Sequence, residues 1–208
     1  MEKAALTREL ALRLPRYFRV LRQYVIRGRQ KVSSGELSGQ LGITASQVRR
    51  DLGCLGLSGQ NGYGYSVKEL HDALGEELGV FGGRTAIIIG AGHLGHALAA
   101  HRMFVGRGFT LIGVFDRDPA AVGRKIADLS VLPMDRLAEF CRTHHPHIAL
   151  LAVDAKNAQD AAQAVCACGI KGLLNFTETE LDVPEQIPVE SVHVGDMLYV
   201  LSQRISDE

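Results

Sequence analysis

Residues 85–100 constrain the fold of this chain more than any other segment. An apolar stretch with three successive isoleucines leads through GAGHLG, at residues 90–95, into an alanine-rich segment. This order predicts a buried strand, a tight turn and a helix. Gly90 permits the sharp turn, Gly92 lets the backbone approach a pyrophosphate, and Gly95 lets the helix pack closely on the strand. We therefore predict dinucleotide contacts from Gly90, Ala91, Gly92, His93, Leu94 and Gly95.

An acidic residue follows at the spacing that such a turn requires. Asp116 lies 21 residues after Gly95, at the end of the apolar segment 111–115. A carboxylate there accepts hydrogen bonds from ribose hydroxyls and repels a 2′-phosphate, which favours NAD(H) over NADP(H). Arg117 beside it can stack on adenine. Further cofactor contacts are expected at the ends of neighbouring strands, from Val153, Asn175 and Phe176. The alternative is a glycine turn that serves packing alone.

Strand and helix patterns alternate through the rest of the chain. Strands are expected at residues 85–89, 110–115, 131–132, 148–153 and 172–176, and near Val192. Helices are expected between them, at residues 92–104, 119–122, 134–144 and 155–168. This order implies a parallel sheet that is covered on both faces. A last helix, residues 194–205, carries an apolar stripe.

The N-terminal part of the chain has a different character. Residues 1–60 hold eleven Lys or Arg and four Asp or Glu, so this part is +7 although the whole chain is formally neutral. Such asymmetry suggests a basic segment that meets a polyanion. Helical periodicity over residues 6–27 is interrupted by Pro15, which predicts two helices meeting there. Residues 33–37 then indicate the start of a short helix, residues 36–41, with a serine as its cap and Gly42 as its end. Thr44 or Ser46 caps the next helix, residues 45–55.

Two short helices joined by a glycine-containing turn make a helix-turn-helix. In residues 45–55 the apolar Val48 and Leu52 share one face, whereas polar side chains lie opposite, as in a recognition helix. Gln can read adenine and Arg can read guanine, each by two hydrogen bonds. An Asn-Gly pair then predicts a hairpin, which is a wing. The alternative is a plain packing module. Predicted DNA contacts are Arg13, Arg16, Ser46, Gln47, Arg49, Arg50, Gln60, Asn61 and Tyr63.

The whole chain resembles the Rex family of redox-sensing transcriptional repressors. The resemblance is carried by LRLP with Tyr17, VSS with Glu36-Leu37, QVRRDL, GYGY, GAGHLG, FD with Asp118-Pro119, and GIKG with LNF at residues 174–176. It implies a homodimer whose C-terminal helix exchanges between subunits, a double-stranded palindromic DNA operator, and release from it when NADH replaces NAD⁺. The expected fold is α/β, with a winged helix-turn-helix domain at residues 1–80, a Rossmann domain at 81–193 and a swapped dimerisation helix at 194–208.

Some positions depart from the family pattern. Gln60 and Asn61 stand where Lys or Arg is common, and His101 and His193 stand where Tyr and Asp are frequent. A relative that binds NAD(H) with altered or lost DNA binding is therefore the second interpretation, and a small NAD-dependent oxidoreductase is the third. We expect no enzyme and no catalytic residue, because the two domains leave no room for a substrate domain.

The remaining expectations concern surroundings and metals. The sequence shows neither a signal peptide nor a membrane span, and its four cysteines form no CxxC pair, so a cytoplasmic protein is expected. The histidines of the segment HHPH at residues 144–147 are poorly spaced to converge on one ion. We therefore expect neither a metal site nor a membrane partner.

Overall fold

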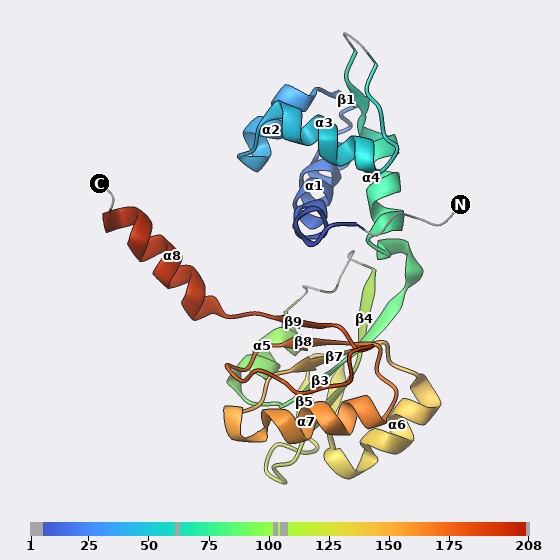
Figure 1. Ribbon diagram of the computed structural model, residues 1–208. Helices are drawn as coiled ribbons and strands as arrows, with labels where there is room; N and C mark the ends of the chain where they lie inside the picture. The colour runs from blue at the N-terminus through green and yellow to red at the C-terminus, as the bar shows by residue number, and fades with distance from the viewer. Residues whose placement is uncertain (1–5, 61–62, 102–103, 105–107, 207–208) are drawn as a thin grey trace. The chain divides into compact units, whose positions relative to one another are not determined.

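The computed structural model describes residues 6–60, 63–101, 104 and 108–206 (Figure 1). The chain divides into two compact units, Met1–Gly82 and Gly83–Glu208. The first unit is mainly helical and the second is built on a mostly parallel sheet. This architecture confirms the expected fold class.

The first unit is a helix-turn-helix followed by a small antiparallel pair of strands. Its elements are α1 (Arg8–Ile26), β1 (Lys31–Val32), α2 (Ser34–Leu41), α3 (Ala45–Cys54), β2 (Tyr65–Ser66), α4 (Val67–Glu77) and the 3₁₀ turn η1 (Val80–Gly82). Strands β1 and β2 pair antiparallel, and a bridge between Gln60 and Gly64 continues toward the wing. The predicted turn residues Asn61 and Gly62 lie outside the described part of the chain.

Local capping explains where the two central helices begin and end. Ser33 and Glu36 form a reciprocal capping box at the start of α2, and Gly42 ends that helix in the left-handed conformation with φ 66°. The Thr44 hydroxyl caps α3 by accepting from the Gln47 amide at 3.1 Å. A serine cap for α2 and the start of α3 at Ala45 are therefore confirmed, and Thr44 rather than Ser46 is the cap of α3. Helix α2 begins at Ser34, two residues before the predicted start.

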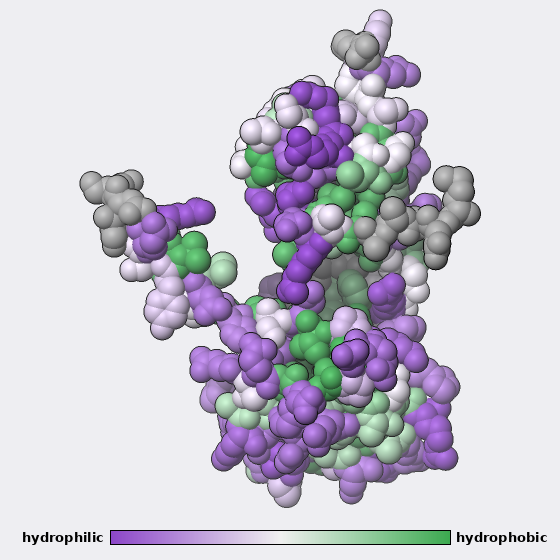
Figure 2. All heavy atoms as spheres, in the orientation of Figure 1, coloured by the Kyte–Doolittle hydropathy of each residue, from purple (hydrophilic) through white to green (hydrophobic). Residues whose placement is uncertain are grey.

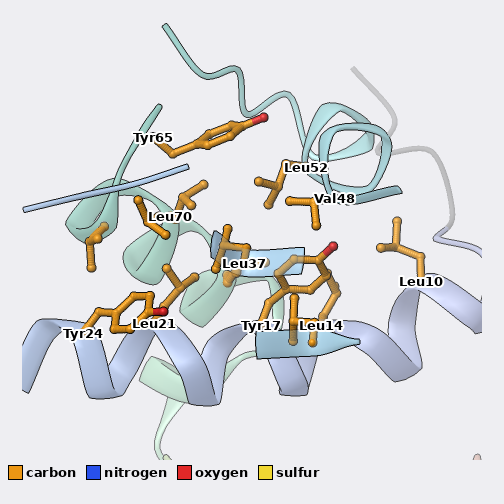
Figure 3. Packing of buried hydrophobic residues seen from close by; sticks show 14 residues of the cluster. Leu10, Leu14, Tyr17, Leu21, Tyr24, Leu37, Val48, Leu52, Tyr65 and Leu70 are labelled. Atoms are coloured by element: carbon orange, nitrogen blue, oxygen red, sulfur yellow. The ribbon is translucent and has the colours of Figure 1, made fainter. Parts of the chain in front are cut away.

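One apolar core joins all four helices of this unit. Leu14, Tyr17 and Leu21 of α1 point toward Leu37 of α2 and Val48 of α3 (Figure 3), and all five are at most 1% exposed. Burial of each such side chain contributes about 1.5–3 kcal/mol. The core includes side chains from α1, α2, α3 and α4, so the orientation of α3 follows from its packing on α2 and on the shared core.

The predicted break at Pro15 is wrong, because α1 runs unbroken from Arg8 to Ile26 with Pro15 inside it. Proline removes the hydrogen bond to the carbonyl four residues earlier, at Ala11. Both residues lie on the exposed side of α1, where water can satisfy that carbonyl. Buried Leu14 and Tyr17 on the opposite side keep the helix in one piece, so packing outweighs the local penalty.

The second unit is a seven-stranded sheet with helices on both faces. Its elements are β3 (Arg84–Ile89), α5 (His93–Ala100), β4 (Phe109–Asp116), β5 (Lys125–Ile126), β6 (Leu129–Pro133), the 3₁₀ turn η3 (Met134–Arg136), α6 (Leu137–His144), β7 (Ile148–Leu151), α7 (Ala155–Ala167), β8 (Gly172–Asn175), β9 (Val189–Ser191) and α8 (Val194–Ser206). The strand order is β5-β6-β4-β3-β7-β8-β9, and every pair except the β5–β6 hairpin is parallel.

Alternate residues of β3 serve the two faces of this sheet. Ile87 and Ile89 pack with α6 and α7, whereas Ala86 and Ile88 pack on the side of α5. Figure 1 shows α6 and α7 together against one face. Because β3 is central and buried on both faces, it reads as a continuous apolar run.

The helix predicted at residues 119–122 is wrong, and the hairpin that follows it was missed. The Asp118 carboxylate accepts from the Ala120 amide at 2.8 Å, and the Asp118 carbonyl accepts from the Ala121 amide at 2.9 Å. These bonds close a single turn, which Gly123 ends with φ 82°. The turn goes no further because the Gly123 amide donates to the Val131 carbonyl of β6 at 2.9 Å, which leads the chain into the β5–β6 hairpin.

Candidate functional site

Two glycines of the turn between β3 and α5 are required by close backbone approach. A Cβ at Gly95 would lie 1.8 Å from the Gly90 carbonyl oxygen, and a Cβ at Gly90 would lie 2.4 Å from the Ala152 oxygen. Gly92 differs, because a Cβ there would meet nothing within 4 Å. Gly92 is also the N-cap of α5, so amide groups at the helix start face open space without a side-chain cap.

A cavity of about 710 Å³ lies beside this turn, at the carboxyl ends of β3, β4 and β7. Of the predicted cofactor residues, Gly92, Asp116, Arg117 and Val153 line it. Sequence reasoning missed the wall that α7 contributes, which includes Lys156, Asn157, Asp160, Ala161 and Ala164. The position of a helix start directly after β7 is the signal that could have indicated this wall.

Asp116 holds the glycine turn as well as facing the cavity. One carboxylate oxygen accepts from the Ala91 amide at 2.6 Å, and the other accepts from the Asp118 amide at 2.8 Å. Each carboxylate oxygen has a second lone pair, so the group can still accept from a ribose hydroxyl. The cavity therefore combines an acceptor, open helix amides and apolar walls, and an adenosine diphosphate group fits this set of donors and acceptors.

Asn175 and Phe176 do not line this cavity. Asn175 is fully buried, and its amide nitrogen donates to the Thr179 carbonyl at 2.9 Å. Its amide oxygen accepts from the Thr177 amide and hydroxyl at 2.9 and 2.7 Å. Phe176 packs on the α5 side of the sheet. Asn175 thus shapes the loop after β8, and this internal bonding could not be seen in a sequence pattern.

Helix α3 presents the predicted polar face outward. Ser46, Arg49 and Arg50 are exposed, whereas Val48 and Leu52 are fully buried. Arg49 donates to the Ser34 and Ser46 hydroxyls at 3.1 and 3.2 Å, which holds its guanidinium between α2 and α3. These exposed groups are suited to phosphates and base edges in a major groove.

A buried carboxylate, Asp51, lies behind this face. Asp51 forms a forked ion pair with Arg13 at two distances of 2.8 Å, and it accepts from the Tyr17 hydroxyl at 3.0 Å. The Gln47 amide donates to it at 2.7 Å. Burial by itself raises the pKa of Asp51, but the hydrogen bonds from Arg13, Gln47 and Tyr17 outweigh burial and leave that pKa below its ordinary value.

The two arginines predicted on α1 are engaged within their own unit. Arg13 binds Asp51, and Arg16 donates to the Leu41 carbonyl at the end of α2. Both contacts tie α1 to the helix-turn-helix. Their partners lie 38 and 25 residues away in the sequence, so no local pattern could reveal them.

The wing holds one further cation that the sequence did not single out. The Lys31 ammonium lies 4.7 Å from the centre of the Tyr63 ring, and Tyr63 is 69% exposed. Gln60 is exposed at the bridge to Gly64. Asn61 lies outside the described residues. Lys31 therefore places a positive charge beside the wing aromatic ring.

Metal-binding and membrane-spanning features are absent from the described residues. Within them, no group of three or more His, Cys, Asp or Glu side chains is arranged to hold a metal ion. None of their helices has the length and hydropathy of a membrane span.

One chain carries a winged helix-turn-helix and an α/β unit whose fold is typical of nucleotide binding. This combination defines a ligand-responsive DNA-binding regulator. Family models agree with this division: "Putative DNA-binding protein N-terminus" matches residues 8–53, and "CoA binding domain" matches residues 83–179. A redox-sensing transcriptional repressor Rex from Caldanaerobacter subterraneus subsp. tengcongensis is 40% identical over 207 residues, covering 100% of this chain and 92% of that protein. The namesake from Clostridium perfringens strain SM101 is 39% identical, covering 96% and 94%. The chain belongs to the Rex family of redox-sensing transcriptional repressors.

Solved structures extend the likeness to three dimensions. The crystal structure of RSP in complex with beta-NAD⁺ and operator DNA is 38% identical with a TM-score of 0.91, covering 99% of this chain and 94% of that one. The structure of RSP with beta-NADH is 36% identical with a TM-score of 0.88, covering 99% and 96%. RSP is described as a Rex-family repressor.

Proposed function

We propose that this protein is a repressor that binds operator DNA through its winged helix-turn-helix and leaves it when NADH occupies the second unit. The observation that carries the proposal is the likeness over 99% of the chain to RSP, whose structure holds beta-NAD⁺ and operator DNA. This similarity includes both the DNA-binding unit and the nucleotide-binding unit of the chain. The cofactor pair NAD⁺ and NADH differs at the nicotinamide by one charge and by ring planarity.

Different residues of the second unit contact different parts of NAD(H). Amides at the start of α5, opened by Gly92, donate to the pyrophosphate. Asp116 accepts from the adenosine ribose and disfavours a 2′-phosphate, which selects NAD(H) over NADP(H). Arg117 and Val153 line the same cavity and cover the adenosine. Asn175 acts indirectly, by shaping the loop after β8, and Phe176 supports the sheet on the side of α5.

The C-terminal helix α8 supports a homodimer. Val194, Met197, Leu198, Leu201 and Ile205 follow helical spacing, and each is at least 54% exposed in the single chain. Figure 2 shows hydrophobic side chains at the surface of this helix. An apolar stripe of this size is normally covered by a partner, and we propose that α8 is exchanged with a second copy. We also propose that the protein is cytoplasmic and has no catalytic activity of its own.

A second candidate function is nucleotide binding with weakened DNA binding. Gln60 brings no positive charge to the wing, and Arg13 and Arg16 bind groups within their own unit. Fewer free cations mean fewer phosphate contacts and a shallower dependence of affinity on salt. The second candidate therefore predicts a smaller slope of DNA affinity against salt concentration than the first, and this slope can be measured.

One experiment tests both candidates. Operator sequences are selected from random double-stranded DNA by the full-length protein with NAD⁺, and NADH is then titrated against the selected site at two salt concentrations. We expect NADH to weaken binding at least tenfold, which corresponds to a coupling of about 1.4 kcal/mol. Binding of NADH in calorimetry without any selected DNA would favour the second candidate. Absence of nucleotide binding would overturn both.

A further inference from the structure

The side-chain amide of Gln47 has a fixed orientation at the surface of α3. We propose that Asp51 holds the nitrogen of this amide inward, so that Gln47 presents its oxygen to DNA and selects bases that carry an amino group in the major groove, adenine or cytosine. Asp51 is then a positioning residue for base selection. The inference rests on the proposed DNA binding and adds the chemical class of base that is read.

The geometry begins with the bonding capacity of the Asp51 carboxylate. One oxygen accepts from Arg13 Nη2 at 2.8 Å and from Gln47 Nε2 at 2.7 Å. The other accepts from Arg13 Nε at 2.8 Å and from the Tyr17 hydroxyl at 3.0 Å. A carboxylate has about four lone-pair sites, and all four are used here. The bond to Gln47 is therefore one corner of a saturated network that is 2% exposed at Asp51.

An ionised carboxylate accepts hydrogen bonds and donates none. Rotating the Gln47 amide by half a turn would bring its oxygen against the Asp51 oxygen, and two acceptors repel each other. The lowered pKa of Asp51 keeps the carboxylate charged at neutral pH. The buried neighbour thus excludes one of the two orientations that a free glutamine amide adopts.

The outward group is the amide oxygen. Gln47 Oε1 accepts from Arg50 Nη1 at 3.4 Å on the exposed side of the helix. Gln47 is the third residue of α3, in the first turn, where recognition helices meet base edges. A carbonyl oxygen has two lone pairs, so it can accept from Arg50 and from one base amino group together.

The major groove offers amino donors at adenine N6 and cytosine N4, whereas guanine and thymine present acceptors at the corresponding positions. An outward oxygen therefore favours adenine or cytosine and repels guanine and thymine. If the amide were free to rotate, its nitrogen could donate to guanine or thymine, and the position would discriminate less.

The test uses DNA selection by the full-length protein and three variants. For the wild type we expect one position in each half-site to prefer adenine or cytosine by about five- to tenfold. Gln47→Met should flatten that position alone. Asp51→Asn, whose amide can donate or accept, should admit guanine or thymine there. Arg49→Met is the matched control, because Arg49 does not contact Asp51, and it should weaken binding without changing that position.

A second measurement avoids reliance on the folding of Asp51→Asn. The selected base is replaced by an analogue that lacks the amino group, which is purine for adenine or 2-pyrimidinone for cytosine. The replacement should weaken the wild type about five- to tenfold and leave Gln47→Met unchanged. A Gln47-dependent position occupied by guanine or thymine, or an analogue without effect, would overturn the inference while DNA binding stands. If the wild type selected no sequence, the proposed function would fall and the inference with it.

Discussion

Arg13 and Asp51 form a forked ion pair in which two guanidinium nitrogens lie 2.8 Å from the two carboxylate oxygens, across 38 residues of sequence. The pair joins α1 to the recognition helix α3. Tyr17 and Gln47 complete its bonding, so one buried carboxylate connects the core of the unit with its DNA-facing surface.

Asp51→Ala should destabilise the N-terminal unit by about 3 kcal/mol, because Arg13 and the buried Tyr17 hydroxyl lose their partner. The readout is faster hydrogen exchange of the α1 and α3 backbone amides, measured on the full chain. Asp72→Ala is the control, since Asp72 binds the exposed Lys68 and that pair adds little. Equal losses in the two variants would contradict a special role for Asp51.

Glu36 makes stability depend on pH in a defined window. Hydrogen bonds from the Ser33 amide and then from Arg29 lower the pKa of Glu36 from 4.5 to about 2. A carboxyl group whose pKa is lower in the folded state than in the unfolded state raises the free energy of unfolding at any pH above its unfolded-state pKa. This contribution is lost as the pH falls through the folded-state pKa. Glu36→Gln should therefore flatten the loss of stability between pH 4.5 and pH 2, followed by circular dichroism. Glu185→Gln, outside the capping box, should retain the wild-type slope.

Gly92→Ala and Gly95→Ala separate ligand approach from packing. A Cβ at Gly92 meets no atom within 4 Å, so the unliganded variant should melt as the wild type does. If the pyrophosphate approaches the backbone at Gly92, as we propose, the added methyl group blocks it, and NADH binding should fall at least tenfold, about 1.4 kcal/mol. Gly95→Ala should lower the melting temperature itself, because its Cβ collides with the Gly90 carbonyl. Calorimetry and thermal unfolding, applied to both, distinguish these outcomes.

Asp116→Ala should weaken NADH binding and reduce the preference against NADPH. Loss of a charge-assisted hydrogen bond costs about 1.5–3 kcal/mol, which is roughly ten- to a hundredfold in affinity. The variant also frees the Ala91 amide, so the turn loses one restraint. Asp135→Ala, an exposed acid of η3 outside the cavity, serves as the charge control. An unchanged ratio of NADH to NADPH affinity would contradict the assignment of Asp116.

Leu201→Glu should dissociate the dimer without unfolding the chain. Leu201 is 54% exposed in the single chain, so the charge perturbs the monomer little. Burying a carboxylate against a partner is costly, and the dimer dissociation constant should rise at least about a hundredfold. Sedimentation equilibrium measures the change. Arg204→Glu, outside the apolar stripe, should remain a dimer, and a monomeric wild type would contradict the exchange of α8.

Several features followed from short-range chemistry alone. They are the glycine turn, the caps of α2 and α3, and the apolar faces of both cores. Each depends on neighbours within about one helical turn or one strand, so a short segment of sequence is enough to predict it. The resemblance to the Rex family was visible for the same reason, because its motifs are local strings that survive in order along the chain.

Other features depend on residues that meet only after folding. Pro15 stays inside α1 because buried side chains on the opposite face hold the helix. Residues 119–122 form only a single turn because the Gly123 amide donates to the Val131 carbonyl of β6. The sequence by itself determined the two domain types and the place of the nucleotide turn. Only the tertiary structure decided that Arg13 binds Asp51, because these partners are 38 residues apart and become neighbours through packing and not through spacing. Gln47 lies one helical turn from Asp51, but its oxygen turns outward because packing buries that carboxylate among Arg13 and Tyr17.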